Sequence, residues 1–344
     1  MEQVFNPLIG PVWQVENLLT QFWDRAQPEL RHPLIPHSIL DSFCFIRVSG
    51  QLTSSTTSES TPQQIPAVRY SAESEIRNPI KLFADMWTDT WNGRELAWRL
   101  FLRNIRALYR QTLLGLFWAF LPPVANTAIW IFLRQQGVFN IGDMQVNETL
   151  YILTGMILWQ AFGDSIQMPL KVLNQHKSML SKLRFSREAL LLVGLGEVVF
   201  DLLIRIVLLA LAIAWYGVAP SFAALGAVVA IIMMIALGAT LGILLMPIGS
   251  LYQDVGRLLS MFVPFWMILT PIIYVPATSF PGTMLNWLNP ASPFLILSRD
   301  LLLLGQSDMW FPAFIWFLIT IPLTIFGLVV FRISIPVLVE RMNT

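Results

Sequence analysis

Residues 206–253 read IVLLALAIAWYGVAPSFAALGAVVAIIMMIALGATLGILLMPIGSLYQ and contain no Asp, Glu, Lys or Arg. Residues 258–298 form a second stretch without these four residue types. A bilayer core about 30 Å thick is crossed by a helix of roughly 20 apolar residues, so the first stretch is long enough for two spans. Water-soluble cores rarely need such stretches. The sequence therefore predicts an all-α integral membrane protein.

The composition of the whole chain agrees with this prediction. Of its 344 residues, 55% are hydrophobic and 12% are charged, and the mean hydropathy is +0.62. A soluble domain carries about 25% charged residues. The net charge of +1 gives no reason to expect nucleic acid as a partner. The single cysteine, Cys44, excludes an internal disulfide and a cysteine metal site, and the three histidines lack ligand spacing, so we expect no metal.

Six transmembrane helices are predicted from the apolar stretches and their breaks. The prolines at 122 and 123 should kink the first span, and Pro264 and Pro271 should interrupt the fifth. The predicted spans are Leu113–Leu133, Leu150–Leu170, Ala189–Trp215, Phe222–Met246, Leu258–Tyr274 and Pro312–Phe331.

The segment Val275–Leu304 is too broken by proline for a span and too apolar for a solvated loop. Irregular backbone is tolerated at membrane depth where protein or a cavity surrounds it. We therefore expect a re-entrant pair of short helices between spans five and six.

The chain before the first span divides into two parts. Residues 1–92 contain scattered prolines and the Ser/Thr/Gln/Pro-rich tract 52–66, so they are expected to form a largely disordered cytoplasmic extension. Residues 93–112 carry arginines and apolar side chains at three- and four-residue steps, which predicts an amphipathic helix at the membrane interface. Residues 113–344 form the predicted membrane domain.

Basic residues flank the spans unequally, and such residues collect on the cytoplasmic side. Only Arg134 and Arg299 lie on the other side, which we take as the outer one. Both termini are therefore expected in the cytoplasm and the re-entrant pair outside. The basic residues assigned to the cytoplasmic side are Arg94, Arg99, Arg103, Arg106, Arg110, Lys171, Lys177, Lys182, Arg184, Arg187, Arg257, Arg332 and Arg341.

Charges inside a predicted span need an explanation, because each costs about 2.5–3.5 kcal/mol on insertion scales. Glu197, Asp201 and Arg205 follow one another at four-residue steps on the third span. Two interpretations are open: a proton or ion relay, or a structural ion pair between Asp201 and Arg205 packed against a neighbouring helix. We favour the ion pair.

Aromatic side chains are frequent in the spans and in the re-entrant segment. They suit an interfacial belt, and they would also suit a path for sugar rings, whose C–H faces stack on aromatics. The residues considered for such a path are Trp118, Phe265, Trp266 and Tyr274.

The sequence contains no phosphate-binding G-x-x-x-x-G-K-[ST] loop and no cluster of residues typical of hydrolysis. We therefore expect a transporter subunit that binds no cofactor itself.

Five motifs together resemble the permease subunits of ABC exporters for O-antigen, capsular polysaccharide and teichoic acid. They occur in the order and spacing of that family and cover about residues 92–344. The segment 180–188 resembles the family's cytoplasmic coupling segment, with Ser186 where proline is usual. The motifs are Tyr109–Gly115 followed by Trp118 and Pro122, then Leu180–Glu188, Leu251–Val255, Thr270–Tyr274 and Asn289-Pro290.

The resemblance implies a homodimer in the bacterial inner membrane, bound to two copies of a separate ABC ATPase that holds ATP and Mg²⁺. The cargo would be a lipid-linked glycan that moves outward among membrane lipids, and Arg103, Arg106 and Arg110 could receive its pyrophosphate. The residues that would contact the ATPase are Lys182, Arg184, Phe185, Arg187, Glu188, Tyr252, Gln253 and Asp254.

Two other functions remain open from the residues alone. A membrane-embedded enzyme acting on lipid-linked sugars would need a carboxylate such as Glu197, Asp201 or Asp300. A secondary transporter driven by an ion gradient would need a coupling site within the membrane, and only Glu197–Asp201–Arg205 offers one.

Overall fold

The computed structural model describes residues 79–110, 115–138, 146–176, 188–219, 221–277 and 279–342. These residues belong to one compact unit, 69–344. The described part of the chain forms helices and no strands, which confirms the predicted all-α class. Residues 1–78 lie outside the described residues, so their predicted disorder stays a prediction. Residues 79–92, predicted to belong to the disordered extension, are helical, and the helix predicted over 93–112 begins at Pro79.

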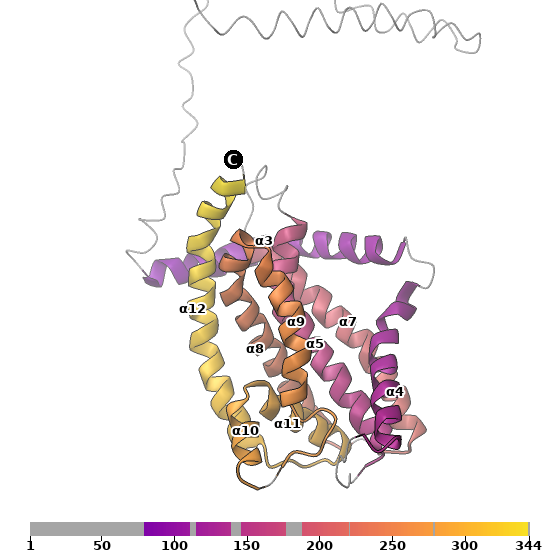
Figure 1. The fold of residues 1–344 in the computed structure, drawn as a ribbon. Coiled ribbons are helices and arrows are strands. Elements are labelled where there is room, and N and C mark those ends of the chain that lie inside the picture. Colours follow the sequence, from indigo (N-terminus) through magenta and orange to yellow (C-terminus); the bar gives the residue numbers. More distant parts are fainter. Residues whose placement is uncertain are drawn as a thin grey trace, which may run out of the picture. The chain divides into compact units, whose positions relative to one another are not determined.

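The order of the helices places one amphipathic helix before a bundle of longer, more apolar ones. In Figure 1, α3 lies across one end of the bundle, and α10 and α11 lie at the other end. The helices are α3 (Pro79–Arg110), the 3-10 helix η1 (Gly115–Ala119), α4 (Leu121–Gln135), α5 (Glu148–Gln175), α7 (Glu188–Trp215), α8 (Ala224–Leu251), α9 (Asp254–Leu269), α10 (Gly282–Leu288), α11 (Ala291–Leu303) and α12 (Trp310–Met342).

Three helices are long and apolar enough to cross a membrane by length and composition: α7, α8 and the part of α12 from Trp310 to Ser334. Helices α4 and α9 are shorter, with 15 and 16 residues. Helix α5 has 28 residues but contains several polar ones, and most of its surface is covered by α4, α7 and α8. A protein that crosses the membrane several times is supported, and the count of six spans stays a prediction.

Prolines lie at the ends of some helices and inside others. Pro264 was expected to interrupt the fifth span, but it lies inside the continuous helix α9. Pro122 and Pro123 were expected to kink the first span, but α4 begins at Leu121 with proline in its first turn. Proline suits that position because the first N–H groups of a helix have no partner within the helix. Helix α9 ends at Leu269, earlier than the predicted Tyr274, and Thr270 is extended. The residue before a proline avoids the helical region, so Pro271 explains this end.

The core is centred on α5, which packs against α7 and α8, while α8 packs against α11 and α12. Close contact between α5 and α8 depends on Gly238 and Gly242, which face backbone and side-chain atoms of Phe162, Ser165 and Ile166. Two small residues four apart let helix backbones approach closely in membranes.

The segment between α9 and α12 contains the two short helices α10 and α11, as expected. Arg299 on α11, one of the two basic residues assigned to the outer side, is 1% exposed. The orientation of the chain stays a prediction. The Nη1 of Arg299 donates to the carbonyl oxygen of Pro271 at 2.8 Å, and its guanidinium carbon lies 3.7 Å from the centre of the Tyr151 ring. The charge thus ties α11 to the end of α9 and to α5. The re-entrant position of α10 and α11 stays a prediction.

Candidate functional site

The turn between α8 and α9 presents three of the predicted ATPase-contact residues together. Helix α8 ends at Leu251, Tyr252 is extended, and α9 begins at Asp254. Tyr252 is 63% exposed, and Gln253 and Asp254 are also exposed. The backbone N–H of Tyr252 donates to the carbonyl oxygen of Ile248 at 3.0 Å, so the backbone of the turn is fixed while its side chains are exposed. Asp254 accepts a hydrogen bond from Nη1 of Arg257 at 3.4 Å. This geometry suits contact with another protein.

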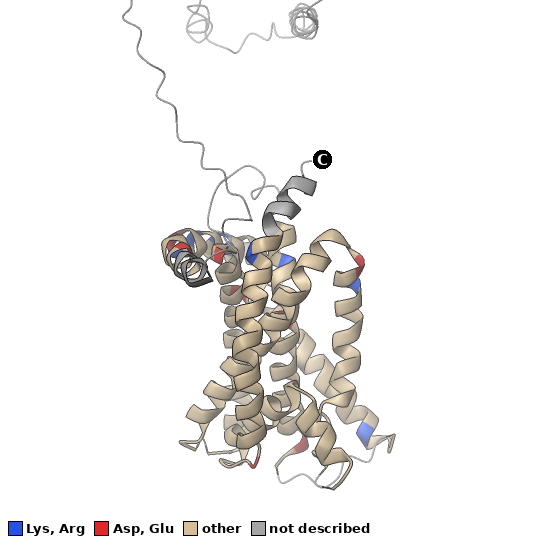
Figure 2. Cartoon of the chain, turned by 90° about the vertical axis from the view of Figure 1, so that its left-hand side faces the viewer, with Lys and Arg blue, Asp and Glu red and all other residues tan. Residues whose placement is uncertain are grey.

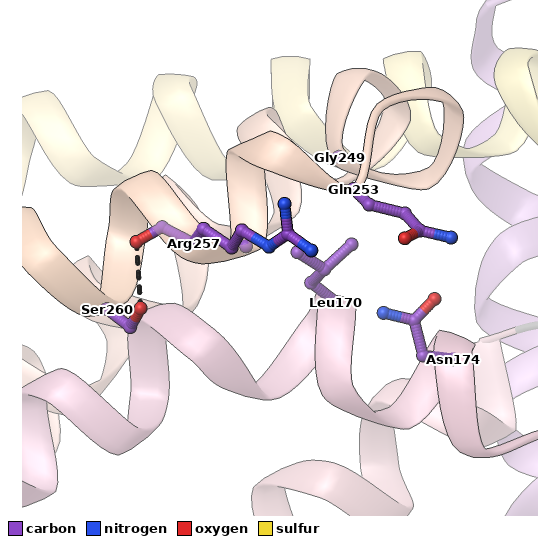
Figure 3. Close-up of a pocket in the computed structure, with 7 residues that line it drawn as sticks. Leu170, Asn174, Gly249, Gln253, Arg257 and Ser260 are labelled. Carbon is purple, nitrogen blue, oxygen red and sulfur yellow. Dashed lines mark hydrogen bonds between the residues drawn. The ribbon is translucent and has the colours of Figure 1, made fainter.

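A cavity of about 500 Å³ opens beside this turn, between the ends of α5 and α8 and the first turns of α9. Figure 3 shows the side chains of Asn174, Gln253 and Arg257 around it. All three offer N–H donors, and two also carry an amide acceptor. The cavity is lined by Leu170, Asn174, Gly249, Gln253, Gly256, Arg257 and Ser260.

Two glycines shape the floor of the cavity. A Cβ at Gly249 would lie 2.9 Å from a methyl carbon of Leu170, and one at Gly256 would lie 3.3 Å from the other. Leu170 of α5 therefore packs directly on the backbone of α8 and α9. The contact of Leu170 with the two glycines joins the exposed turn to the core. A displacement of the turn would therefore also displace α5.

The other predicted ATPase contact is described at its last residue alone. Lys182, Arg184, Phe185 and Arg187 lie outside the described residues.

Glu188 begins α7 and is buried, with its carboxylate 3.2 Å from Nη1 of Arg332 on α12. Nη2 of Arg332 lies 3.2 Å from Asp89 on α3. Glu188 therefore helps to hold three helices together at the base of the predicted coupling segment.

Helix α3 carries the basic and aromatic side chains predicted for a membrane interface. Arg103 and Arg106 are exposed, whereas the Arg110 side chain lies outside the described residues. The guanidinium of Arg94 lies 4.0 Å from the Trp91 ring centre, a favourable cation–π distance. Figure 2 shows charged residues gathered near α3. Binding of lipid pyrophosphate by this helix stays a prediction.

The ion pair expected between Asp201 and Arg205 is not formed. Nη1 of Arg205 instead donates to Asp164 of α5 at 2.7 Å. Glu197 accepts a hydrogen bond from Asn104 of α3 at 2.9 Å and lies 3.6 Å from Nζ of Lys171. Sequence reasoning missed Asp164, although a carboxylate within a predicted span was the signal that could have found it.

The four aromatics considered for a sugar path are in different environments. Trp118 and Phe265 are exposed. Trp266 contacts Trp159 and Phe162 of α5, with ring centres 6.0 and 5.3 Å apart, and its Nε1 donates to Asn289 at 3.0 Å. That contact ties the Asn289-Pro290 motif to α9.

Tyr274 donates from its hydroxyl to the backbone of Ile268. A path for sugars along these four aromatics stays a prediction.

Among the residues that the structure describes, no group of three His, Cys, Asp or Glu side chains could hold a metal ion.

Comparison with known proteins gives relatives of one kind. Over 239 residues, the chain is 23% identical to the O-antigen export system permease protein RfbA of Klebsiella pneumoniae, covering 67% of this chain and 88% of the relative. The chain is similar to O-antigen export permeases. A protein of the same name from Myxococcus xanthus is 24% identical over 196 residues, with 55% of this chain and 72% of the relative covered.

A further Klebsiella pneumoniae protein with that name is 23% identical over 242 residues. No protein-family model matches the chain. The resemblance drawn from the five sequence motifs is confirmed by these relatives, each of which is aligned over most of its own length.

Proposed function

We propose that this chain is the transmembrane subunit of an ATP-driven exporter. It moves a lipid-linked polysaccharide of the O-antigen, capsule or teichoic-acid type from the cytoplasmic side across the bacterial inner membrane. The energy comes from a separate ATPase. The similarity to three O-antigen export permeases supports the transport role, and the exposed turn beside a cavity supports the partner.

The observation that carries the docking proposal is the α8–α9 turn. Tyr252, Gln253 and Asp254 stand exposed on a hydrogen-bonded turn, next to a cavity that could receive a partner's side chain. Leu170 connects that cavity to α5, the most enclosed helix. Movement of a bound ATPase would thereby be transmitted into the bundle.

The rest of the assembly follows from the proposed energy source. ATP and Mg²⁺ are held by the ATPase, of which two copies bind a homodimer of this chain. Six helices per copy are few to enclose a polymer, so two copies make a wider path. The termini lie in the cytoplasm, and the pyrophosphate of the cargo lipid meets Arg103, Arg106 and Arg110 on α3.

Cysteine crosslinking tests the docking proposal. Cys44 is replaced by Ser, and Asp254→Cys or Arg184→Cys is co-expressed with the candidate ATPase carrying a surface cysteine. We expect both positions to crosslink to the ATPase, and nucleotide to change the yield. Asn147→Cys is the matched control, because Asn147 is exposed at the opposite end of α5 from Asn174. Crosslinks at Asn147 alone, or at none of the three positions, would contradict the proposal.

A further inference from the structure

Helix α5 has one open stripe, and that stripe is entirely polar. From Leu150 to Leu173, every residue is buried except Gln160, Asp164, Gln167 and Lys171. These four follow one another at steps of four, three and four, which places them on a single face of the helix. The apolar residues of α5 are covered by protein, and only its polar side chains are left partly uncovered.

A matching polar stripe lies on α7. Its residues Glu197, Asp201 and Arg205 share one face because they are four residues apart. Lys171 approaches Glu197 at 3.6 Å, and Asp164 accepts from Arg205 at 2.7 Å, so the two stripes face each other in antiparallel order. We call the seven residues of the two stripes the polar seam.

The polar seam lies at membrane depth. Helix α7 is among the three that could cross a bilayer, and Asp201 is close to its middle. Lys171 comes eleven positions after Gln160, which is about 16 Å of helix, roughly half of a bilayer core of about 30 Å. Because Asp201 lies between the two ion pairs, the seam runs from Lys171 on one side of the middle of α7 to Gln160 on the other side.

Several polar atoms of the seam have no hydrogen-bond partner within the described residues. They are Nε of Arg205 and both amide atoms, Oε1 and Nε2, of Gln160, and all are buried. The Arg205 side chain is 10% exposed. Nearly all buried polar atoms in proteins are paired with protein or water, and each unpaired one costs about 1–3 kcal/mol. None of these three atoms has surface that water reaches, so the part of the seam open to a ligand is formed by Asp164, Gln167 and Lys171.

Lipid does not suit the open side of the seam. The Asp164 side chain is 40% exposed. A carboxylate facing acyl chains costs about 2.5–3.5 kcal/mol, so charged residues within the membrane face protein or water-filled cavities. The seam needs a polar neighbour along its length.

The charges of the seam select the class of ligand. The seam contains three carboxylates and two cations, so its net charge is negative and does not favour binding of a phosphate group. Carboxylates and the amide group of Gln167 accept and donate hydrogen bonds, which suits hydroxyl groups. We propose that the polar seam is a water-filled groove that binds the hydroxyl groups of a neutral saccharide. This inference rests on the proposed function, because it names a place where the glycan touches the chain.

Cysteine accessibility tests the groove. Gln167→Cys and Gln160→Cys are made in a chain with Cys44→Ser, because neither glutamine belongs to an ion pair of the seam. Each variant is reconstituted in phosphatidylethanolamine–phosphatidylglycerol vesicles and treated with a charged methanethiosulfonate reagent. Leu203→Cys is the control, since Leu203 is exposed on α7 close to Asp201. The reagent attacks a thiolate, so we expect labelling in the groove about ten times faster than at Leu203.

Maltoheptaose is the saccharide probe, and we expect it to slow labelling of both groove variants severalfold without affecting Leu203→Cys. Labelling as slow as in the control would show that water does not reach the seam and would overturn the proposal. Fast labelling that maltoheptaose leaves unchanged would show water without saccharide binding and would also overturn it.

The chain with no seam substitution supplies a second test. A water-soluble carbodiimide with an amine should modify Asp164, and maltoheptaose should slow that reaction, as read by mass spectrometry of the peptide. Absence of modification, or modification indifferent to maltoheptaose, contradicts the groove. Neither test uses the ATPase or transport, so a negative result here leaves the crosslinking result, and with it the proposed function, to be judged separately.

Discussion

Arg299→Met is expected to lower the free energy of unfolding by about 3 kcal/mol. The Nη1 of Arg299 donates to the carbonyl oxygens of Pro271 and Ile272, at 2.8 and 3.4 Å, just after α9 ends. Each buried carbonyl left without a donor costs about 1–3 kcal/mol. The contact with the Tyr151 ring adds up to about 2 kcal/mol when it is removed from water. Relief from burying a charge offsets part of this loss.

Thermal and denaturant unfolding in detergent micelles would measure the change. Arg257→Met is the control, because Arg257 is highly exposed and its contact with Asp254 is long, at 3.4 Å. We expect the control to change stability by less than about 0.5 kcal/mol. Equal stability of the two variants would show that Arg299 does not hold α11 to the end of α9.

Gly242→Ala is expected to cost about 2 kcal/mol, through separation of α5 and α8. A Cβ at Gly242 would lie 2.2 Å from the carbonyl oxygen of Ile166 and 2.8 Å from Cδ of Pro169. The first of these is a backbone atom, so no rotamer change can make room. Overpacking of a closely packed core costs about 1–3 kcal/mol and sometimes more. The gain in helix propensity of about 1 kcal/mol is too small to compensate.

Gly327→Ala on α12 is the matched control for this substitution. Its Cβ would meet the side chains of Leu244 and Ile243 at 3.3 and 3.4 Å, and side chains can adjust. We expect the control to be as stable as the original chain or more stable, since alanine favours helix. If the Gly242→Ala variant has the same free energy of unfolding as the control, α5 and α8 are less closely packed than the structure indicates.

The sequence predicted long helices well where nothing interrupts the apolar run. The third predicted span, Ala189–Trp215, agrees with α7 within one residue, because charges and a glycine turn flank it. The first and fifth spans were predicted less well, since proline has opposite effects in the first turn and the interior of a helix. Composition alone does not tell which position a proline will occupy.

Side-chain partners were harder to predict than helices. Arg205 was assigned to Asp201 on its own helix, yet it pairs with Asp164 on α5. Arg299 was assigned to the outer side, which stays a prediction, and its burial against Tyr151 was not predicted. Both contacts join segments far apart in the chain, which periodicity along one helix does not report. Tyr252, Gln253 and Asp254, which the family resemblance gave as ATPase contacts, are exposed, and their contact with an ATPase stays a prediction.

Transport in reconstituted vesicles tests most directly the claim that the work is delivered by another subunit. The chain is reconstituted alone, with the candidate ATPase, and with an ATPase variant unable to hydrolyse ATP, and a fluorescent lipid-linked oligosaccharide is followed across the bilayer. We predict ATP-dependent movement only with the active ATPase. Uphill movement by the chain alone, driven by a proton gradient or by no ATPase at all, would contradict the account.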